Sequence, residues 1–384
     1  MRHGIKNIIK MLFSGDTAED VAIQTKLINF RHLIAFDSGK AALLAGLRVM
    51  AKIKADRNEV IIPAYTCFSV AAVIENAGLR LVLCDILPET LDFDYEMLSG
   101  LMSERTLCVM PTHLFGKSAD VGRVKSLAVH YGSYVIEDSA QSLPEKGDSS
   151  HADIAIFSFG RGKPLSAGGG GGLASNQEAI IKAIQSESVS DADNSFLARI
   201  SIILGLLLND FLISPYIYRL PASLPFLKIG KTIYPDDVAI ASMPKCKTRL
   251  INNLVCKYDE LSRSRHEKSQ FYCRSFGLPD NLNRITHLGQ SYYRPIRHPF
   301  YLSGSVSSLP DRVVSRMRVL GVVRMYPCGL HKLKEVQGFW VNKMTTFPGT
   351  DWVSEHLLSL PVHSLVKKQD QIRVVEYLKN CVMK

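Results

Sequence analysis

The chain of 384 residues is 46% hydrophobic and 21% charged, which excludes a disordered, collagen-like or low-complexity protein and predicts one large domain with a smaller one. Its longest apolar run, residues 200–208, is too short to span a bilayer, so an integral membrane protein is not expected. The 46 basic and 36 acidic residues leave a net charge of +10. Because the basic residues are scattered and form no nucleic-acid-binding motif, we predict no nucleic-acid partner.

The eight cysteines include no C-x-x-C pair, which argues against a zinc site or a thiol redox couple, and no metal is predicted. Cys84 and Cys108 stand inside apolar runs and are expected to be small buried hydrophobes. The basic N-terminus carries no small-residue cleavage site, so no signal peptide is predicted. These features are typical of a reduced protein of the cytoplasm.

Between residues 32 and 175, short apolar runs alternate with helical stretches. This alternation predicts an α/β fold with a mostly parallel sheet, and the continuous apolar runs are typical of strands covered on both faces. The predicted strands are 59–63, 80–85, 107–112, 134–137, 154–159 and 172–174. The predicted helices are 40–51, 69–77, 94–101, 121–130 and 176–185.

Residues 196–235 form an insertion that is apolar on nearly all sides and is interrupted by prolines. A helix of this kind is usually buried, here at a subunit interface. The alternative is a segment lying on a membrane surface, helped by Arg199, Lys228 and Lys231, which would make the protein peripheral to the inner membrane. Because the segment lacks a strongly charged face, burial is the favoured interpretation.

Residues 244–271 predict one long polar helix with a basic cluster on a solvated face. The cluster consists of Arg263, Arg265, His266, Lys268 and Arg274. The remainder, 275–384, mixes short strands and helices, which predicts a smaller C-terminal α+β domain. We place the domain boundary between a large domain, 1–245, and a small one, 246–384.

The stretch YVIEDSAQ, residues 134–141, is an apolar strand that ends in acidic residues. It places Asp138 at the carboxyl edge of the sheet, where open α/β sheets bind ligands. The alternative is that Asp138 is a helix N-cap, which accepts a hydrogen bond from the N–H of Ala140 or Gln141. Taken alone, the stretch favours the N-cap.

The stretch FSFGRGKP, residues 157–164, is followed by the glycine run 168–172. A lysine after a strand and a loop of small residues, here Lys163, is typical of a phosphate ligand or a nucleophilic amine. The P-loop and G-x-G-x-x-G patterns both fail, since Lys163 precedes a proline and a leucine stands at the third glycine position. The glycine run is either a linker or, more commonly inside a folded domain, a place where backbone passes close to a ligand.

Ser38 and Gly39 begin a predicted helix, where free backbone N–H groups would face an anion, although both are also ordinary caps. A phosphate cradle, a carboxylate at a strand end and a lysine after a later strand are together what pyridoxal phosphate (PLP) requires. The lysine forms a Schiff base with PLP, and the carboxylate keeps the pyridine nitrogen protonated, so that the ring can accept electrons.

In these features the chain resembles the DegT/StrS family of PLP-dependent nucleotide-sugar aminotransferases, which have the aspartate-aminotransferase (type I) fold. The resemblance covers nearly the whole chain and is densest from residue 36 to 175. Its most specific part is the pair EDSAQ and SFGRGK, in this order. Further matching stretches are FDSGKAALLAGL, PTHLFGKSAD, RMYPCGL and FPGTDWVSEHLLSLPVHSL.

The resemblance implies roles for single residues. Lys163 would be the Schiff-base lysine and would also move a proton, and Asp138 would pair with the pyridine nitrogen. The remaining cofactor contacts would be Ser38, Gly39, Lys40 and Ser158 on the phosphate, Gln141 on the ring 3-oxygen and Phe68 on the ring face. The residues on the substrate side would be His113, Tyr326 and His363.

Two departures from the family pattern stand out. Cys67 occupies the position of the usual stacking aromatic, so Phe68 is the candidate for that contact, and 234–243 replaces the family's G-x-N-x-R segment. The resemblance predicts a homodimer that moves an amino group, with glutamate as the expected donor, to a keto group of a nucleotide-linked sugar in polysaccharide or glycoconjugate biosynthesis. The alternatives are another PLP activity on a non-sugar substrate and a non-catalytic regulatory protein with this fold.

Overall fold

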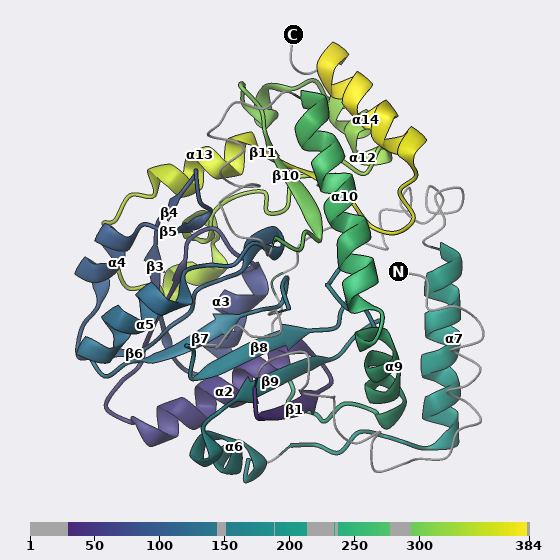
Figure 1. Cartoon of the computed structure of the whole chain (residues 1–384). Helices are drawn as coiled ribbons and strands as arrows, with labels where there is room; N and C mark the ends of the chain where they lie inside the picture. Colours follow the sequence, from purple (N-terminus) through teal and green to yellow (C-terminus); the bar gives the residue numbers. More distant parts are fainter. Residues whose placement is uncertain are drawn as a thin grey trace.

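The computed structural model describes residues 30–143, 151–187, 189–212, 234, 237–276 and 293–381. Its centre is a seven-stranded sheet in the order β1-β9-β8-β7-β6-β2-β3 (Figure 1). The strands of this sheet are β1 (His32–Phe36), β2 (Glu59–Pro63), β3 (Arg80–Cys84), β6 (Thr106–Val109), β7 (Tyr134–Asp138), β8 (Ile154–Ser158) and β9 (Gly171–Ser175). A separate small pair consists of β4 (Ile86–Leu87) and β5 (Asp92–Phe93).

The sheet is mostly parallel, as predicted. Strands β3, β2, β6, β7 and β8 pair in parallel, and β9 runs antiparallel to both of its neighbours. All six predicted strands are present, but β1 was not predicted. This half-buried edge strand pairs His32 with Ser175, so its partner lies far away in the sequence and no local pattern reveals it.

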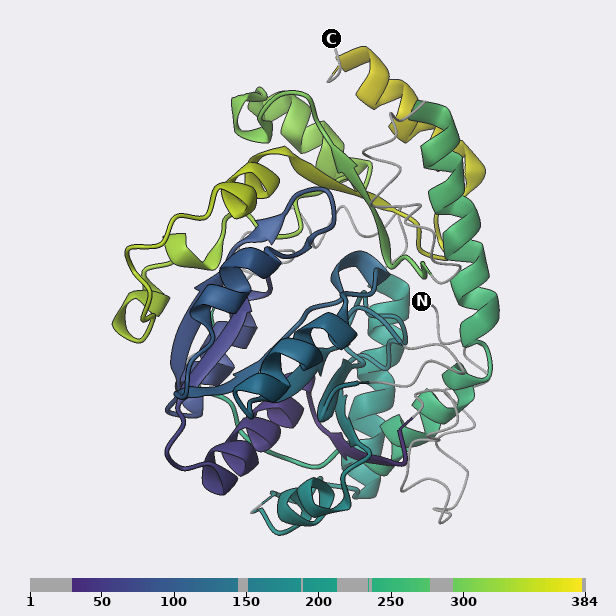
Figure 2. The ribbon, with the colours of Figure 1, turned by 60° about the vertical axis from the view of Figure 1, so that its left-hand side comes forward.

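Helices cover both faces of the sheet (Figure 1, Figure 2). Alternate side chains of β2 show why: Val60 and Ile62 join the core cluster of α2 and α3, whereas Ile61 joins that of α4 and α5. The five helices predicted here are confirmed, with ends within two residues of the prediction. They are α2 (Gly39–Ile53), α3 (Phe68–Asn76), α4 (Tyr95–Leu101), α5 (Val121–His130) and α6 (Glu178–Gln185).

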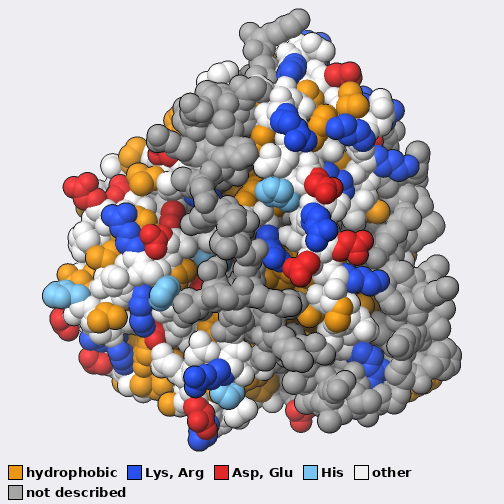
Figure 3. Space-filling model, viewed as in Figure 1, with side chains coloured by type: hydrophobic (Ala, Val, Ile, Leu, Met, Phe, Trp, Pro, Cys, Tyr) orange, Lys and Arg blue, Asp and Glu red, His pale blue; other side chains and the backbone are white. Residues whose placement is uncertain are grey.

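The predicted long helix over 244–271 is wrong: two helices, α9 (Lys245–Val255) and α10 (Tyr258–Phe276), meet at a turn. The turn lets Leu254 and Tyr258 bury themselves in one apolar cluster, while α10 runs on toward the C-terminal strands (Figure 1). The basic cluster is also not wholly solvated, because Arg265 is buried. Lys and Arg side chains do gather on the surface over α10 and α14 (Figure 3).

The C-terminal part mixes helices and strands, as expected. Antiparallel strands β10 (Arg297–Tyr301) and β11 (Leu357–Pro361) pack against α12 (Asp311–Val319) and α14 (Lys368–Cys381) around Phe300 and Leu358. Leu330, Val336 and Phe347 instead join the core of the large sheet. They belong to or precede the short turns η6 (Leu330–Lys332) and η7 (Glu335–Gly338) and the helix α13 (Pro348–His356). Two further turns are η3 (Leu114–Gly116) and η5 (Val306–Ser308).

The helix α7 (Phe196–Leu212) has two different sides. Ile203 and Leu206 are buried in a cluster with side chains of β8 and α9, whereas Leu204 and Leu208 are exposed. The expectation that this helix is covered all round is therefore wrong for one of its sides. The rest of the insertion, 213–233, lies outside the described residues. Among the helices described, none combines the length and the hydropathy that crossing a bilayer requires.

Candidate active site

Asp138 is the last residue of β7, in the middle of the sheet, and its side chain is buried. Its Oδ1 accepts a hydrogen bond from the Ala140 N–H at 3.0 Å. This is the contact that the N-cap alternative predicted, but residues 139–143 form no helix. Burial raises the pKa of Asp138, and the Ala140 N–H and the positive charge of Lys163 oppose that shift. A cation beside Asp138 therefore favours its ionised form.

Lys163 lies in the turn that follows β8, and its side chain is half-buried. The turn passes through Gly162 at a φ of +75°, a conformation that favours glycine. A Cβ at Gly160 would stand 3.6 Å from Ser158 Oγ and 4.0 Å from Lys163 Cγ. The turn thus folds the stem of Lys163 back toward the end of β8, on the carboxyl edge where Asp138 also lies.

The start of α2 supplies a place for an anion. Ser38 caps the helix by accepting a hydrogen bond from the Ala41 N–H at 3.1 Å. The start of a helix is where backbone N–H groups and the helix dipole favour an anion. A Cβ on Gly39 would stand 3.2 Å from Ser158 Cβ. Because Gly39 has no side chain, Ser158 can lie directly beside the start of α2.

The glycine run lies close against the backbone at the start of α2. A Cβ on Gly171, the first residue of β9, would lie 2.3 Å from the Gly39 nitrogen. Gly168, Gly169 and Gly170 all have positive φ values, which glycine adopts without strain. The run holds β9 against the start of α2. It thereby fixes the position of Ser38, Gly39 and Lys40, which we call the anion cradle together with Ser158.

We expect Gly171→Ala to lower the free energy of unfolding by about 1–3 kcal/mol, since the added Cβ forces backbone apart. It should also weaken PLP binding, because the start of α2 must move. Gly172→Ala is the matched control, since its Cβ would meet only side-chain carbons of Leu33, at 3.3 Å or more. Urea denaturation and a PLP titration measure both variants, and equal losses in the two would contradict this account of the cradle.

Gln141 and Tyr326 contact each other near the carboxyl edge of the sheet, where β7 ends. Gln141 Nε2 donates to the Tyr326 hydroxyl at 2.9 Å, and its Oε1 accepts from the Phe115 N–H at 3.0 Å. The Phe68 ring stacks on Tyr326 with centroids 6.4 Å apart and is buried in the core. Phe68 therefore serves first as core packing, and its neighbour Cys67 is the more exposed of the two.

His113 is buried, and both of its ring nitrogens have partners inside the chain. Nδ1 accepts from the Ala119 N–H at 2.8 Å, so Nε2 carries the proton that it donates to Glu137 Oε1 at 2.8 Å. The backbone N–H of His113 donates to the Asp138 carbonyl oxygen at 3.1 Å. These bonds hold His113 against the strand end that carries Asp138. The substrate-side role that the resemblance implied for His113 stays a prediction.

Burial alone would lower the pKa of His113, but its hydrogen bond to Glu137 and the carboxylate charge raise it. The hydrogen bond that Nδ1 accepts from the Ala119 N–H opposes this rise, because a protonated Nδ1 cannot accept it. Glu137→Gln should therefore lower this pKa. In the wild type, the raised pKa stabilises the fold below about pH 6.5, and this contribution disappears as the pH rises through the raised value.

The loss of unfolding free energy in Glu137→Gln should accordingly be larger at about pH 6 than at about pH 9, as measured by urea denaturation. Glu178→Gln, on the surface of α6, is the control. A loss that is the same at both pH values would show that His113 is not charged in the folded protein.

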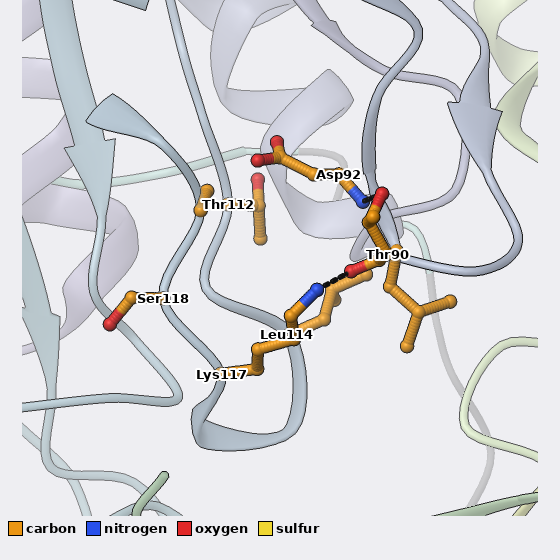
Figure 4. A pocket seen from close by; sticks show the side chains of 8 residues that line it. Thr90, Asp92, Thr112, Leu114, Lys117 and Ser118 are labelled. Carbon is orange, nitrogen blue, oxygen red and sulfur yellow. Dashed lines mark hydrogen bonds between the residues drawn. The ribbon is translucent and has the colours of Figure 1, made fainter. Parts of the chain in front are cut away.

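A shallow recess lies beside the segment that carries His113 (Figure 4). Thr90, Asp92, Thr112 and Lys117 are among its lining residues. Lys117 Nζ donates to the Thr90 carbonyl oxygen, and burial lowers the pKa of Lys117 to about 8. Lys117 is thus a second amine with a reduced proton affinity, and experiments on Lys163 have to distinguish the two.

Helix α10 joins the Lys163 turn to the C-terminal part. Arg265 Nη2 donates to the carbonyl oxygen of Pro164, the residue after Lys163, at 3.1 Å. One turn further on, Lys268 Nζ donates to the carbonyl oxygen of His363 at 3.0 Å. His363 is exposed and follows β11, so α10 places it near the Lys163 turn without a side-chain contact to Asp138 in the part of the chain described.

The sequence analysis assigned no role to Glu137 or Arg265. Strand geometry could have identified Glu137. Successive side chains of a strand point to opposite faces of the sheet, so Glu137 lies on the face opposite to Asp138, where a buried carboxylate needs a hydrogen-bond partner. For Arg265 the signal was helical spacing, since it shares one side of α10 with the buried Tyr258 and Tyr272.

Residues 19–199, which contain the anion cradle, Asp138 and Lys163, match the DegT/DnrJ/EryC1/StrS aminotransferase family. By this segment the chain is similar to that family. A GDP-perosamine synthase of Caulobacter vibrioides is 33% identical over 154 residues, 39% of this chain and 41% of the relative. A UDP-2-acetamido-2-deoxy-3-oxo-D-glucuronate aminotransferase of Pseudomonas aeruginosa is 33% identical over 133 residues, 33% of this chain and 37% of the relative. The chain thus matches about two fifths of the length of these DegT/StrS relatives.

Solved structures extend the likeness in fold to the whole chain. PseC of Helicobacter pylori, an aminotransferase involved in the biosynthesis of pseudaminic acid, aligns with a TM-score of 0.74 at 17% identity, over 100% of this chain and 96% of that one. The PMP-form of a putative sugar aminotransferase of Streptococcus pneumoniae aligns with a TM-score of 0.73 at 18% identity, over 98% and 96%. The predicted type I aminotransferase fold is therefore confirmed.

Proposed function

We propose that this protein is a PLP-dependent aminotransferase that moves an amino group from an amino acid to a keto group of a nucleotide-linked sugar. The observation that carries the proposal is the placement of Asp138, Lys163 and the anion cradle at one edge of the sheet, in a chain similar to the DegT/StrS family. Glutamate is the proposed donor.

The residues present fit PLP. The start of α2 would hold its phosphate together with Ser158, which packs closely against Gly39, and Gln141 and Cys67 would adjoin its ring. When bound, PLP supplies an electron sink for the bond changes at the amino-acid Cα. Asp138, whose pKa burial raises, would be kept ionised by the cations around it and would orient the ring nitrogen.

Lys163 would provide the amine that holds the cofactor and then carry a proton between carbon atoms of the reacting pair. The turn at Gly160–Gly162 and the Arg265 hydrogen bond to Pro164 fix where this amine can move. His113 and Glu137 would keep the end of β7 in place behind Asp138. Each role is thereby assigned to a residue whose position the fold controls.

The substrate class is extended from relatives, several of whose names specify nucleotide-linked sugars. A homodimer is the proposed active form, with the amino-acid and sugar sites used in turn. The competing proposal is a non-catalytic protein with the same fold, favoured by Cys67 at the stacking position and by the absent G-x-N-x-R segment.

Spectroscopy separates these proposals. The purified chain reconstituted with PLP should show the absorbance of a PLP–lysine adduct, and added glutamate should convert it to the amine form of the cofactor. Isotope-labelled glutamate should then pass nitrogen to a nucleotide-linked ketosugar in a substrate panel. A chain that stays colourless with PLP is the non-catalytic protein, and conversion by glutamate without transfer to any nucleotide-linked ketosugar points to a non-sugar substrate.

A further inference from the structure

Helix α10 carries two cations, Arg265 and Lys268, that donate only to neutral oxygens. Arg265 is 8% exposed, and its Nη2 donates to the carbonyl oxygen of Pro164 at 3.1 Å. Lys268, one turn further on, is half-buried, and its Nζ donates to the carbonyl oxygen of His363 at 3.0 Å and to Ser264 Oγ at 3.4 Å. Within the described part of the chain, neither side chain forms an ion pair with a carboxylate.

Elsewhere the chain pairs its partly buried cations with acids. The side chain of Lys125 is 29% exposed, and its Nζ lies 2.7 Å from Asp153 Oδ2. The side chain of Arg294 is 19% exposed, and its Nη1 lies 3.0 Å from Asp259 Oδ1. Because burying a guanidinium without a counter-ion is costly, Arg265 departs from this pattern in a way that a bound anion would correct.

The two cations also act on each other and on His363. Arg265 and Lys268 are three residues apart on one face of α10. Burial and the charge of Arg265 lower the pKa of Lys268, and the exposed Glu267 opposes that shift. Desolvation of its ring, together with the charges of Arg297 and of the two α10 cations, lowers the pKa of His363 to about 4. The positive potential is therefore concentrated around Arg265, Lys268 and His363, which we call the α10 cluster.

The α10 cluster extends from the Lys163 turn to the surface. Pro164 directly follows Lys163, so Arg265 marks the inner end of the cluster. His363 is exposed and follows β11, so it marks the outer end. Helix α10 itself runs from the sheet toward the C-terminal strands (Figure 1). A ligand that reacts at Lys163 and extends toward this surface would lie along these side chains.

The chemistry of the cluster suits phosphate groups. A guanidinium and an ammonium both donate charge-assisted hydrogen bonds to phosphate oxygens, and a neutral imidazole donates one more. The carboxylate of an amino donor fits less well, because it must remain beside the donor Cα at the Lys163 amine, whereas Arg265 contacts the backbone beyond that residue. In a nucleotide-linked sugar, the sugar ring separates the phosphates from the reacting carbon.

We propose that the α10 cluster binds the phosphate groups of the nucleotide-linked substrate, with Arg265 toward the sugar and His363 toward the nucleoside. The identity of this ligand rests on the proposed function. The presence of an anion site rests only on the packing and the charge of α10.

The test is calorimetric titration of the full chain, with and without PLP, with UDP, GDP and dTDP and with the nucleosides that lack the phosphates. The wild type should bind at least one diphosphate at least about tenfold more tightly than its nucleoside. Lys268→Met and Arg265→Met should each weaken this binding at least about tenfold, and Lys268→Arg, which keeps the charge, should retain most of it.

Arg263→Met is the matched control, because Arg263 is exposed on the same helix and the substitution removes the same charge. It should bind the diphosphate like the wild type, and circular dichroism checks the folding of each variant. The proposal is overturned if the wild type binds no diphosphate better than its nucleoside, or if Arg263→Met loses as much binding as Lys268→Met.

It is also overturned if Lys268→Met leaves diphosphate binding unchanged and instead raises the glutamate concentration needed to convert the cofactor, because the donor carboxylate would then be the ligand. The same measurements separate this proposal from the proposed function. A chain that binds diphosphate but whose cofactor glutamate does not convert retains the site and loses the aminotransferase assignment, whereas conversion without diphosphate binding has the opposite meaning.

Discussion

The Lys163→Ala variant is expected to lose amino transfer by about a thousandfold or more, together with the borohydride-reducible adduct between the protein and PLP. The physical reason is that the amine is both the attachment point of the cofactor and the carrier of the proton. The fold should persist, because the side chain is half-buried and lies in a turn shaped by Gly160 and Gly162. Absorbance, reduction with borohydride and peptide mapping by mass spectrometry measure the outcome.

Two other lysines serve as a control and as a competing site for the adduct in this experiment. Lys182→Ala, on the surface of α6, is the control and should leave the adduct and the rate unchanged. Lys117 is the competing amine, because its pKa of about 8 leaves a fraction of it neutral at physiological pH. An adduct that survives in Lys163→Ala and maps to Lys117 or to any other lysine would refute the assignment.

The Asp138→Asn variant is expected to bind PLP and to turn over at least about a hundredfold more slowly. The amide can still accept the hydrogen bond from the Ala140 N–H, so the local backbone should be kept. It cannot, however, stabilise a protonated ring nitrogen, and the electron sink is weakened. An unchanged kcat would remove Asp138 from the mechanism and leave it as a turn cap.

The same variant makes a prediction about pH and stability without cofactor. Because burial raises the pKa of Asp138, the ionised carboxylate costs folding free energy above that pKa, and the cost disappears as the pH falls through it. Cofactor-free Asp138→Asn should therefore be at least as stable as the wild type at about pH 7, and the difference should vanish in acid. Asp138→Ala is the contrast, since it removes the hydrogen bond to Ala140 as well and should be less stable than Asp138→Asn.

The sequence alone determined the features that rest on local patterns. Continuous apolar runs predicted the central strands, because a strand covered on both faces has no polar side, and 3.6-residue periodicity predicted α2 to α6. The order of EDSAQ and SFGRGK predicted that Asp138 and Lys163 would meet. The carboxyl ends of neighbouring parallel strands lie at one edge of a sheet, so β7 and β8 bring the two residues there.

Only the tertiary structure decided features that depend on distant partners. The edge strand β1 forms because its backbone pairs with β9, which follows more than a hundred residues later in the sequence. The turn between α9 and α10 follows from the shared burial of Leu254 and Tyr258. Both ring nitrogens of His113 form hydrogen bonds inside the chain, to Ala119 and to Glu137, which the sequence did not reveal.

Helix α7 shows the same limit most clearly. Its sequence is apolar on nearly every side, so composition cannot tell which side the protein itself covers. Packing against α9 and the glycine run selects Ile203 and Leu206 for the core and leaves Leu204 and Leu208 outside. Which side is buried is set by the neighbours that the fold supplies, because burial of apolar area has no direction of its own.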